Sequence, residues 1–187
     1  MTSPYDRLLS GKGTWRGSDG AGAQAGGARG RLSPELKFVA TVGLRLDAVA
    51  SVGETVDGVR LDFTVHGSVD GPELNGKFKP CTAYLLISTD GVGTINVRAP
   101  LYLNDGALAE LEATGRYDFG QDGYRRAIGG DLPNSALGWC PRFVTGHPRY
   151  MWLNRALFLG VGELRPAETR VDYDLFLLTS PVPPTAR

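Results

Sequence analysis

Residues 92–117 read VGTINVRAPLYLNDGALAELEATGRY and contain the clearest structural signal in the chain. Apolar side chains alternate with other residues on both sides of Asn104-Asp105-Gly106, and a period of two is typical of a half-buried β-strand. An Asp-Gly turn between two such runs is a strong hairpin signal, because tight hairpin turns need positive φ values. The stretch therefore predicts two antiparallel strands, over Val92–Leu103 and Ala107–Tyr117.

The same alternation continues on both sides of this hairpin. It predicts further strands over residues 36–47, 59–69, 74–78, 82–88, 151–162 and 169–178, whereas residues 118–138 have the glycine breaks and the proline of a loop. No segment has a helical stripe longer than a turn or two. Eight or nine strands have to close or fold over to protect their edges. A single antiparallel, all-β barrel with very little helix is therefore the leading prediction, and a two-sheet sandwich is the alternative.

The barrel domain is predicted over residues 34–180, with a C-terminal tail over residues 181–187. Residues 11–30 contain eight glycines and almost nothing apolar to bury. We therefore interpret residues 1–33 as a flexible Gly-rich extension, either an ordinary tail or a lid or oligomer arm that carries Trp15 and Arg16.

The composition limits the classes of function. Twenty Lys and Arg balance twenty Asp and Glu, and this zero net charge argues against nucleic acid and an anionic membrane surface as partners. No apolar run approaches the roughly 20 residues of a membrane helix, and the first residues lack the pattern of a signal peptide. Two cysteines, Cys81 and Cys140, argue against a disulfide scaffold. These features predict a cytoplasmic protein.

Motifs for metals, cofactors and nucleophiles do not occur in the sequence. His66, His147 and the two cysteines lack the spacing of metal ligands. There is no G-x-S-x-G and no S-x-x-K, and none of the Gly-x-Gly pairs leads into the helix of a βαβ unit. We therefore expect no metal and no cofactor.

Polar side chains on the predicted strands supply candidate site residues. Alternation in the strand over residues 92–103 places Asn96, Arg98 and Tyr102 on one face, opposite the apolar face. Arg98 either faces solvent, as most arginines do, or points into a polar lumen where it would bind a carboxylate or an enolate. His66 could act as a general base, although an exposed structural histidine is the commoner case.

Residues 141–162, PRFVTGHPRYMWLNRALFLGVG, are the densest in aromatic and polar side chains. If this segment is a strand, Trp152 and Asn154 share a face. Burying the Asn154 amide without partners would be costly. Asn154 is therefore expected either to hold a neighbouring turn through backbone hydrogen bonds or to contact a ligand.

The same segment resembles the C-terminal signature of the domain-of-unknown-function 3237 family, approximately P-R-F-E-T-G-x-x-x-Y-x-W-L-N-R-x-V-F-V-x-x-G. Residues 67–80, GSVDGPELNGKFKP, resemble the family's G-x-V-x-G-P-x-L-x-G-x-V-x-P. Residues 95–107, INVRAPLYLNDGA, are similar to its L-D-A-R-Y-x-L-x-T-D-D-G-A. The three motifs occur in order, and the resemblance spans about residues 36–178.

This resemblance implies a compact antiparallel barrel, similar in shape to small lipocalin-like and allene-oxide-cyclase-like barrels, and it implies little about activity. Two carboxylates of the family pattern are absent, because Tyr84 replaces the acid of G-G-A-D-W and Asn96 replaces the acid of L-D-A-R. The matching positions that carry over as candidates are Arg98, Asp105, Tyr150, Trp152, Asn154 and Arg155.

The leading functional hypothesis is a cofactor-independent cyclase, isomerase or lyase that acts on a small, largely apolar or aromatic metabolite in the barrel lumen. Arg98 would stabilise an oxyanion, Tyr84 or Tyr102 would transfer a proton, and Asp105 would be the base unless it is only a turn residue. The candidate catalytic residues are Arg98, Tyr84 and Asp105, and the candidate substrate-binding residues are Asn96, Tyr102, Trp152, Asn154 and His66.

Two other hypotheses use the same barrel. In the first, the lumen binds a small molecule and carries it without chemistry. In the second, the barrel is purely structural and forms a homodimer. The residue types of a lumen for binding and of a lumen for catalysis are the same, so the sequence leaves these alternatives open.

Overall fold

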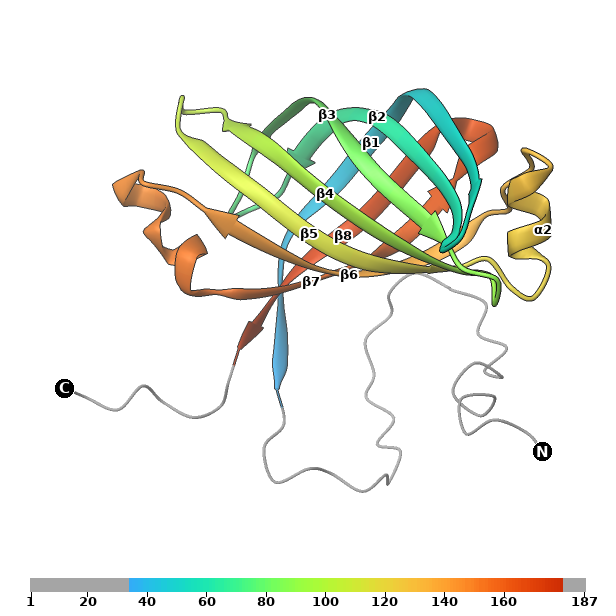
Figure 1. The fold of residues 1–187 in the computed structure, drawn as a ribbon. Helices are drawn as coiled ribbons and strands as arrows, with labels where there is room; N and C mark the ends of the chain where they lie inside the picture. The colour runs from blue at the N-terminus through green and yellow to red at the C-terminus, as the bar shows by residue number, and fades with distance from the viewer. Residues whose placement is uncertain (1–33, 180–187) are drawn as a thin grey trace, which may run out of the picture. The chain divides into compact units, whose positions relative to one another are not determined.

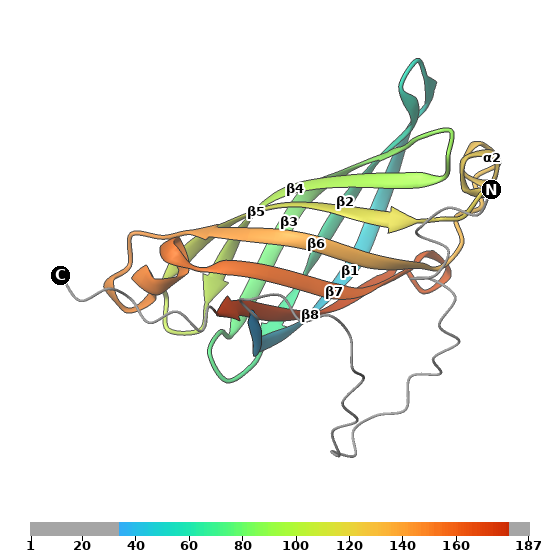
Figure 2. The ribbon, with the colours of Figure 1, turned by 90° about the horizontal axis from the view of Figure 1, so that it is seen from below.

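Eight antiparallel strands follow one another around the sheet, and the first pairs with the last to close a barrel (Figures 1 and 2). The computed structural model describes residues 34–179, and these contain all of the elements named here. The strands are β1 (Glu35–Thr55), β2 (Gly58–Asp70), β3 (Gly76–Ile87), β4 (Val92–Leu103), β5 (Leu108–Asp118), β6 (Ser135–Val144), β7 (Leu157–Arg165) and β8 (Arg170–Thr179).

The prediction of an all-β, closed antiparallel barrel with little helix is confirmed. The described helical segments are α2 (Gly123–Ile128) and the 3-10 helices η1 (Pro148–Arg155) and η2 (Pro166–Glu168). None of the helices in residues 34–179 is long and apolar enough to cross a membrane. The predicted extension over residues 1–33 and the predicted tail over residues 181–187 lie outside the described residues.

Closure depends on β1 and β8, which are distant in sequence. Their ladder runs from Glu35 opposite Thr179 to Arg45 opposite Arg170. An open sheet of this size would leave two edges with unpaired N–H and C=O groups. The β1–β8 ladder pairs these groups with each other.

Three of the predicted strand boundaries were wrong. β1 continues to Thr55. Bulges in its pairing with β2 allow the strand to continue where the alternation of apolar and polar residues is irregular. The segments over residues 74–78 and 82–88 form one strand, β3, because a bulge between Phe78 and Ala83 accommodates Pro80. The segment around residues 151–155 is not a strand but η1, which begins at Pro148, a residue suited to the first turn of a helix.

The interpretation of residues 118–138 as a loop was also partly wrong, because they contain α2 and the start of β6. Gly138 and Pro141 obscure the alternation of β6 in the sequence, although inner and outer positions alternate along the whole strand.

The inner faces of the strands are apolar and fill the lumen. Trp139 of β6 takes the most room there, and both of its cross-strand neighbours are glycines, Gly115 on β5 and Gly160 on β7. A Cβ atom at Gly160 would lie 1.9 Å from Trp139 Nε1, so the indole needs a neighbour without a side chain. Two of the cavities that remain among these side chains are small, with volumes of about 40 and 10 Å³.

Candidate functional site

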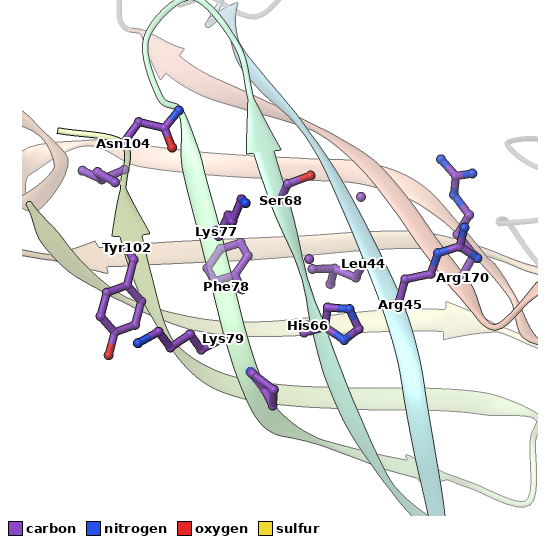
Figure 3. A pocket seen from close by; sticks show the side chains of 14 residues that line it. Leu44, Arg45, His66, Ser68, Lys77, Phe78, Lys79, Tyr102, Asn104 and Arg170 are labelled. Carbon is purple, nitrogen blue, oxygen red and sulfur yellow. The ribbon is translucent and has the colours of Figure 1, made fainter. Parts of the chain in front are cut away.

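A cleft of about 800 Å³ lies on the outer side of the barrel, over β8, β1, β2, β3 and β4 (Figure 3). This volume is in the range of about 300–1,000 Å³ that is typical of small-molecule sites. The polar side chains that line it are Arg45, His66, Ser68, Lys77, Lys79, Tyr102, Asn104 and Arg170.

Strand register brings these residues together from distant parts of the sequence. Arg45 on β1 lies opposite both Arg170 on β8 and His66 on β2. Lys77 on β3 lies opposite Ser68 on β2 and Tyr102 on β4. Since facing residues of neighbouring strands point to the same side of a sheet, two adjacent rows of polar side chains cross the outer surface.

The β3 bulge adds a further cation to the cleft. Phe78 and Cys81 lie opposite inner residues of β2, so the register leaves the two residues between them, Lys79 and Pro80, on the cleft side. The Lys79 ammonium lies 4.1 Å from the centroid of the Tyr102 ring, a distance suited to a cation–π contact. Tyr102 therefore offers the cleft both a ring face and a phenol.

The cleft is strongly positive. None of its lining residues is an aspartate or a glutamate. Among the residues that the structure describes, no carboxylate lies within ion-pair distance of Arg45, Lys77 or Lys79. Arg45 instead donates from Nη1 to the backbone oxygen of Glu168 at 3.5 Å. Uncompensated cations in a concave site attract anions.

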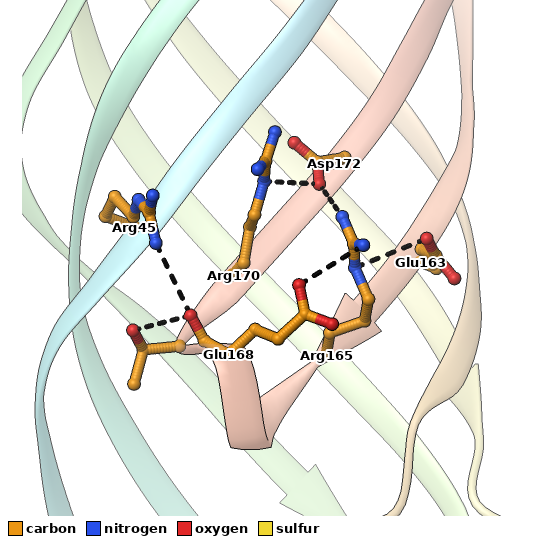
Figure 4. A network of polar contacts seen from close by, with 7 residues as sticks. Arg45, Glu163, Arg165, Glu168, Arg170 and Asp172 are labelled. Carbon is orange, nitrogen blue, oxygen red and sulfur yellow. Dashed lines mark hydrogen bonds and ion pairs between the residues drawn. The ribbon is translucent and has the colours of Figure 1, made fainter.

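A network of ion pairs holds the arginine end of the cleft (Figure 4). Arg170 Nε lies 2.6 Å from Asp172 Oδ2, and the same carboxylate accepts a hydrogen bond from Arg165. Arg165 also lies 3.3 Å from both Glu163 and Glu168, and its bond with Asp172 raises the pKa of the guanidinium. Asp172 thus divides one negative charge between two guanidinium groups, which leaves Arg170 only partly neutralised.

His66 is oriented by a carboxylate. Its Nδ1 lies 2.7 Å from Asp47 Oδ2, and no residue in the described part of the chain forms a hydrogen bond with Nε2. This is the arrangement in which an imidazole acts as a general base, with the carboxylate fixing the ring and its tautomer. Sequence reasoning singled out His66 but missed Asp47, because the partner lies on a neighbouring strand.

Of the residues predicted for the site, only His66 and Tyr102 line this cleft. Arg98 and Asn96 lie on the outer face of the barrel, because the other face of β4 is apolar and fills the lumen. Tyr84 of β3 lies opposite Asn96 and is also on the outer face. The Arg98 side chain is 68% exposed and pairs with Glu110 and Glu112. This exposure places Arg98 in the solvent-facing position and not in the lumen, and the bond with Glu110 raises the pKa of its guanidinium.

Asp105 and Tyr150 lie together outside the cleft. Asp105 accepts a hydrogen bond from the Ala107 backbone at 3.3 Å, as expected of a turn residue. It also accepts one from Tyr150 Oη at 2.8 Å, which lowers the pKa of the carboxyl group, and it lies 3.1 Å from Arg149 Nη1. These contacts tie η1 to the turn between β4 and β5.

Asn154 and Trp152 also attach η1 to the barrel. The Asn154 side chain accepts from the backbone N–H of Thr145 and donates to its oxygen, both at 2.8 Å. Of the two roles expected for Asn154, the structure therefore shows the one in which its side chain forms hydrogen bonds with the backbone. Trp152 packs against Phe158 at 5.9 Å between ring centroids. The two residues do not share the face of a strand, because they belong to a 3-10 helix.

The lumen contains polar groups that were not among the predicted site residues. Tyr117 lines the cavity of about 40 Å³, and Tyr173 and Cys81 line the one of about 10 Å³. Burial raises the pKa of all three groups. A cavity of about 40 Å³ has room for a water molecule but is far smaller than typical metabolite sites. In residues 34–179, no three His, Cys, Asp or Glu side chains are grouped as metal ligands.

Comparisons with known proteins agree with this architecture. The model of the family described as protein of unknown function (DUF3237) matches residues 34–178. A UPF0311 protein of Rhodopseudomonas palustris (strain TIE-1) is 30% identical over 131 residues, which are 67% of this chain and 86% of that protein. The crystal structure of a conserved protein of unknown function from Rhodopseudomonas palustris is similar with a TM-score of 0.69 and 27% identity, over 79% of this chain and 99% of that one.

A more distant structural neighbour is described as an enzyme, from Penicillium herquei. It has 19% sequence identity and a TM-score of 0.56, over 80% of this chain and 98% of its own. At this level of identity the similarity shows the fold alone.

Proposed function

Because the chain belongs to the DUF3237 family of proteins of unknown function, we propose an activity from the residues of its own cleft: cofactor-independent proton transfer on a small anionic molecule with an apolar or aromatic body. One observation carries this proposal. The cleft combines basic side chains that lack carboxylate partners among the described residues with an imidazole already oriented by Asp47. The substrate would bind in the outer cleft and not in the lumen, because the cleft has room for it.

Binding follows from the charge of the cleft. Lys77, Lys79 and Arg45 would pair with an anionic group without first breaking an ion pair within the described barrel. The Tyr102 ring, already next to the Lys79 ammonium, would pack against an aromatic part of the molecule. Binding should therefore weaken as salt screens the cations.

Proton transfer follows from the His66–Asp47 pair. In the tautomer in which Nδ1–H donates to Asp47, Nε2 carries a lone pair and can remove a proton from a carbon acid or a phenol. Asp47 stabilises the imidazolium that forms, and the nearby ammonium groups stabilise the enolate or phenolate. Nε2 then returns the proton to another atom of the substrate, which in an elimination is the departing group as its bond to carbon breaks. The overall change is an isomerisation, a ring closure or an elimination, and it needs no oxidant or reductant.

The test is untargeted mass spectrometry of a small-molecule extract of the source organism, incubated with the purified protein. We expect one metabolite to be consumed and one product to form, with an isomer detected as a shift in retention at constant mass. His66→Asn should slow this conversion by about 10²–10⁴-fold, the usual contribution of a general base.

Arg98→Leu is the matched control, because it removes a surface cation outside the cleft. Its rate should equal that of the wild type. The proposal fails if no metabolite changes, or if His66→Asn converts the metabolite as fast as the wild type does.

A carrier function is the second candidate. The His66 and Asp47 side chains are each 43% exposed, so water reaches the pair, whereas proton transfer from carbon benefits from a dry site. A carrier would retain a metabolite unchanged, and Lys77→Gln would release it. His66→Asn would leave this retention largely intact.

A further inference from the structure

We propose that the natural ligand of the cleft is a dianion, with one anionic group at each end and the reacting centre beside His66. This inference rests on the proposed function, since it concerns the same site. It adds a class of substrate: a small organic molecule that carries two acidic groups separated by an apolar or aromatic spacer.

The cations of the cleft form two separate groups (Figure 3). Arg45 and Arg170 lie opposite each other on β1 and β8, at one end. Lys77 and Lys79 lie on β3, toward the other end. The strand between β1 and β3 contributes His66 to the space that separates them.

The separation of the two groups sets the length of the ligand. Neighbouring strands are about 4.8 Å apart, so β1 and β3 are separated by about 10 Å across the sheet. In Figure 3 the His66 ring lies between the two groups, so a carboxylate paired with Arg45 would lie on the far side of the imidazole from Lys77 and Lys79. A molecule with an acidic group at each end of a spacer can reach both groups, and its middle then lies next to the imidazole.

The two ends differ in chemistry. The Arg170 guanidinium uses Nε for Asp172, and its terminal nitrogens form no hydrogen bond with the described residues. A planar guanidinium edge suits two-point binding of a carboxylate. The lysine end offers point charges beside the Tyr102 ring, which suits a carboxylate or phenolate attached to an aromatic group.

The test is isothermal titration calorimetry of the full chain at low ionic strength. The probes are benzoate with terephthalate, and biphenyl-4-carboxylate with biphenyl-4,4′-dicarboxylate, so that the members of each pair differ by one carboxylate group. In wild type we expect at least one dianion to bind tenfold or more tightly than its monoanion. Arg45→Gln and Lys77→Gln should each reduce this ratio to about threefold or less, because each removes a cation from one end.

Arg98→Gln is the control, since it removes an arginine of the outer face that does not line the cleft. It should keep the full ratio. If both members of a pair bind equally well in wild type, the inference of a dianion is wrong while binding of anions by the cleft still holds. If none of the four probes binds, the proposed anion site itself is wrong, and the dianion with it.

Discussion

The Asp105 side chain, a candidate catalytic base, forms contacts that stabilise the fold. It lies in the predicted turn, yet it also receives hydrogen bonds from Tyr150 of η1 and from the Ala107 backbone. Both bonds favour the ionised carboxylate and lower its pKa. A lowered pKa makes a weaker base at neutral pH, so Asp105 is better suited to anchoring η1 than to removing a proton from a substrate.

Tyr150→Phe should therefore raise the pKa of Asp105, as measured by NMR titration of the carboxyl group. In the wild type the folded-state pKa lies below the ordinary value of about 3.9, so the bond stabilises the fold above that pH. This contribution is lost as the pH falls through the folded-state pKa. The difference in unfolding free energy between wild type and variant should accordingly be constant from about pH 5 to 7 and shrink in stronger acid.

Arg149→Gln is the matched comparison, because the 70% exposed guanidinium is the weaker influence on the same carboxylate. It should shift the Asp105 pKa less than Tyr150→Phe does. An unchanged pKa in Tyr150→Phe would show that the hydrogen bond has no such effect.

At the scale of elements, β6 explains why the lumen is full. The Trp139 indole extends over the glycines of the two neighbouring strands. It therefore fills space that three side chains would otherwise share. Trp139 Nε1 has no hydrogen-bond partner in the described residues, which shows that packing decides its position. An element with Gly138 and Pro141 does not look like a strand by propensity, but this packing requires it to be one.

Gly160→Ala should destabilise the barrel by about 1–3 kcal/mol, because the added methyl group would overlap with the indole. The measurement is urea unfolding followed by circular dichroism. Gly138→Ala is the control in the same sheet, since a Cβ there meets nothing within 4 Å. It should be neutral or slightly stabilising. Equal stabilities for the two variants would contradict the packing argument.

At the scale of the barrel, stability depends on the ladder between the first and last strands. Leu175 of β8 lies at this closure, opposite Ala40 of β1 and Gly160 of β7. It is 1% exposed, and its loss would open a cavity where the sheet has to stay closed. Contacts between segments so far apart in sequence also form slowly during folding.

Leu175→Ala should lower the free energy of unfolding by about 2–5 kcal/mol in urea titrations. Leu157→Ala provides the comparison, because Leu157 of β7 is 69% exposed. We expect that change to stay within about 0.5 kcal/mol of wild type. Similar losses for both variants would mean that the closure is not where the barrel gains its stability.

The sequence by itself determined the class of fold, most of the strands, the hairpin at Asn104-Asp105-Gly106 and the family, because alternation and turn chemistry are local properties. It also identified His66 and Tyr102, which lie in the cleft. Only the tertiary structure decided which face of β4 is inside. Closure of eight strands leaves a lumen that the apolar side chains fill, and Arg98 is therefore outside.

The composition of the cleft likewise depends on tertiary structure. Its residues come from five strands, and the register between strands, including the β3 bulge, decides which side chains are neighbours. No local pattern relates Asp47 to His66 or Arg45 to Arg170, since each pair meets only across a ladder. A balanced net charge over the whole chain also gave no sign of the basic cleft, because the acidic residues lie elsewhere in the fold.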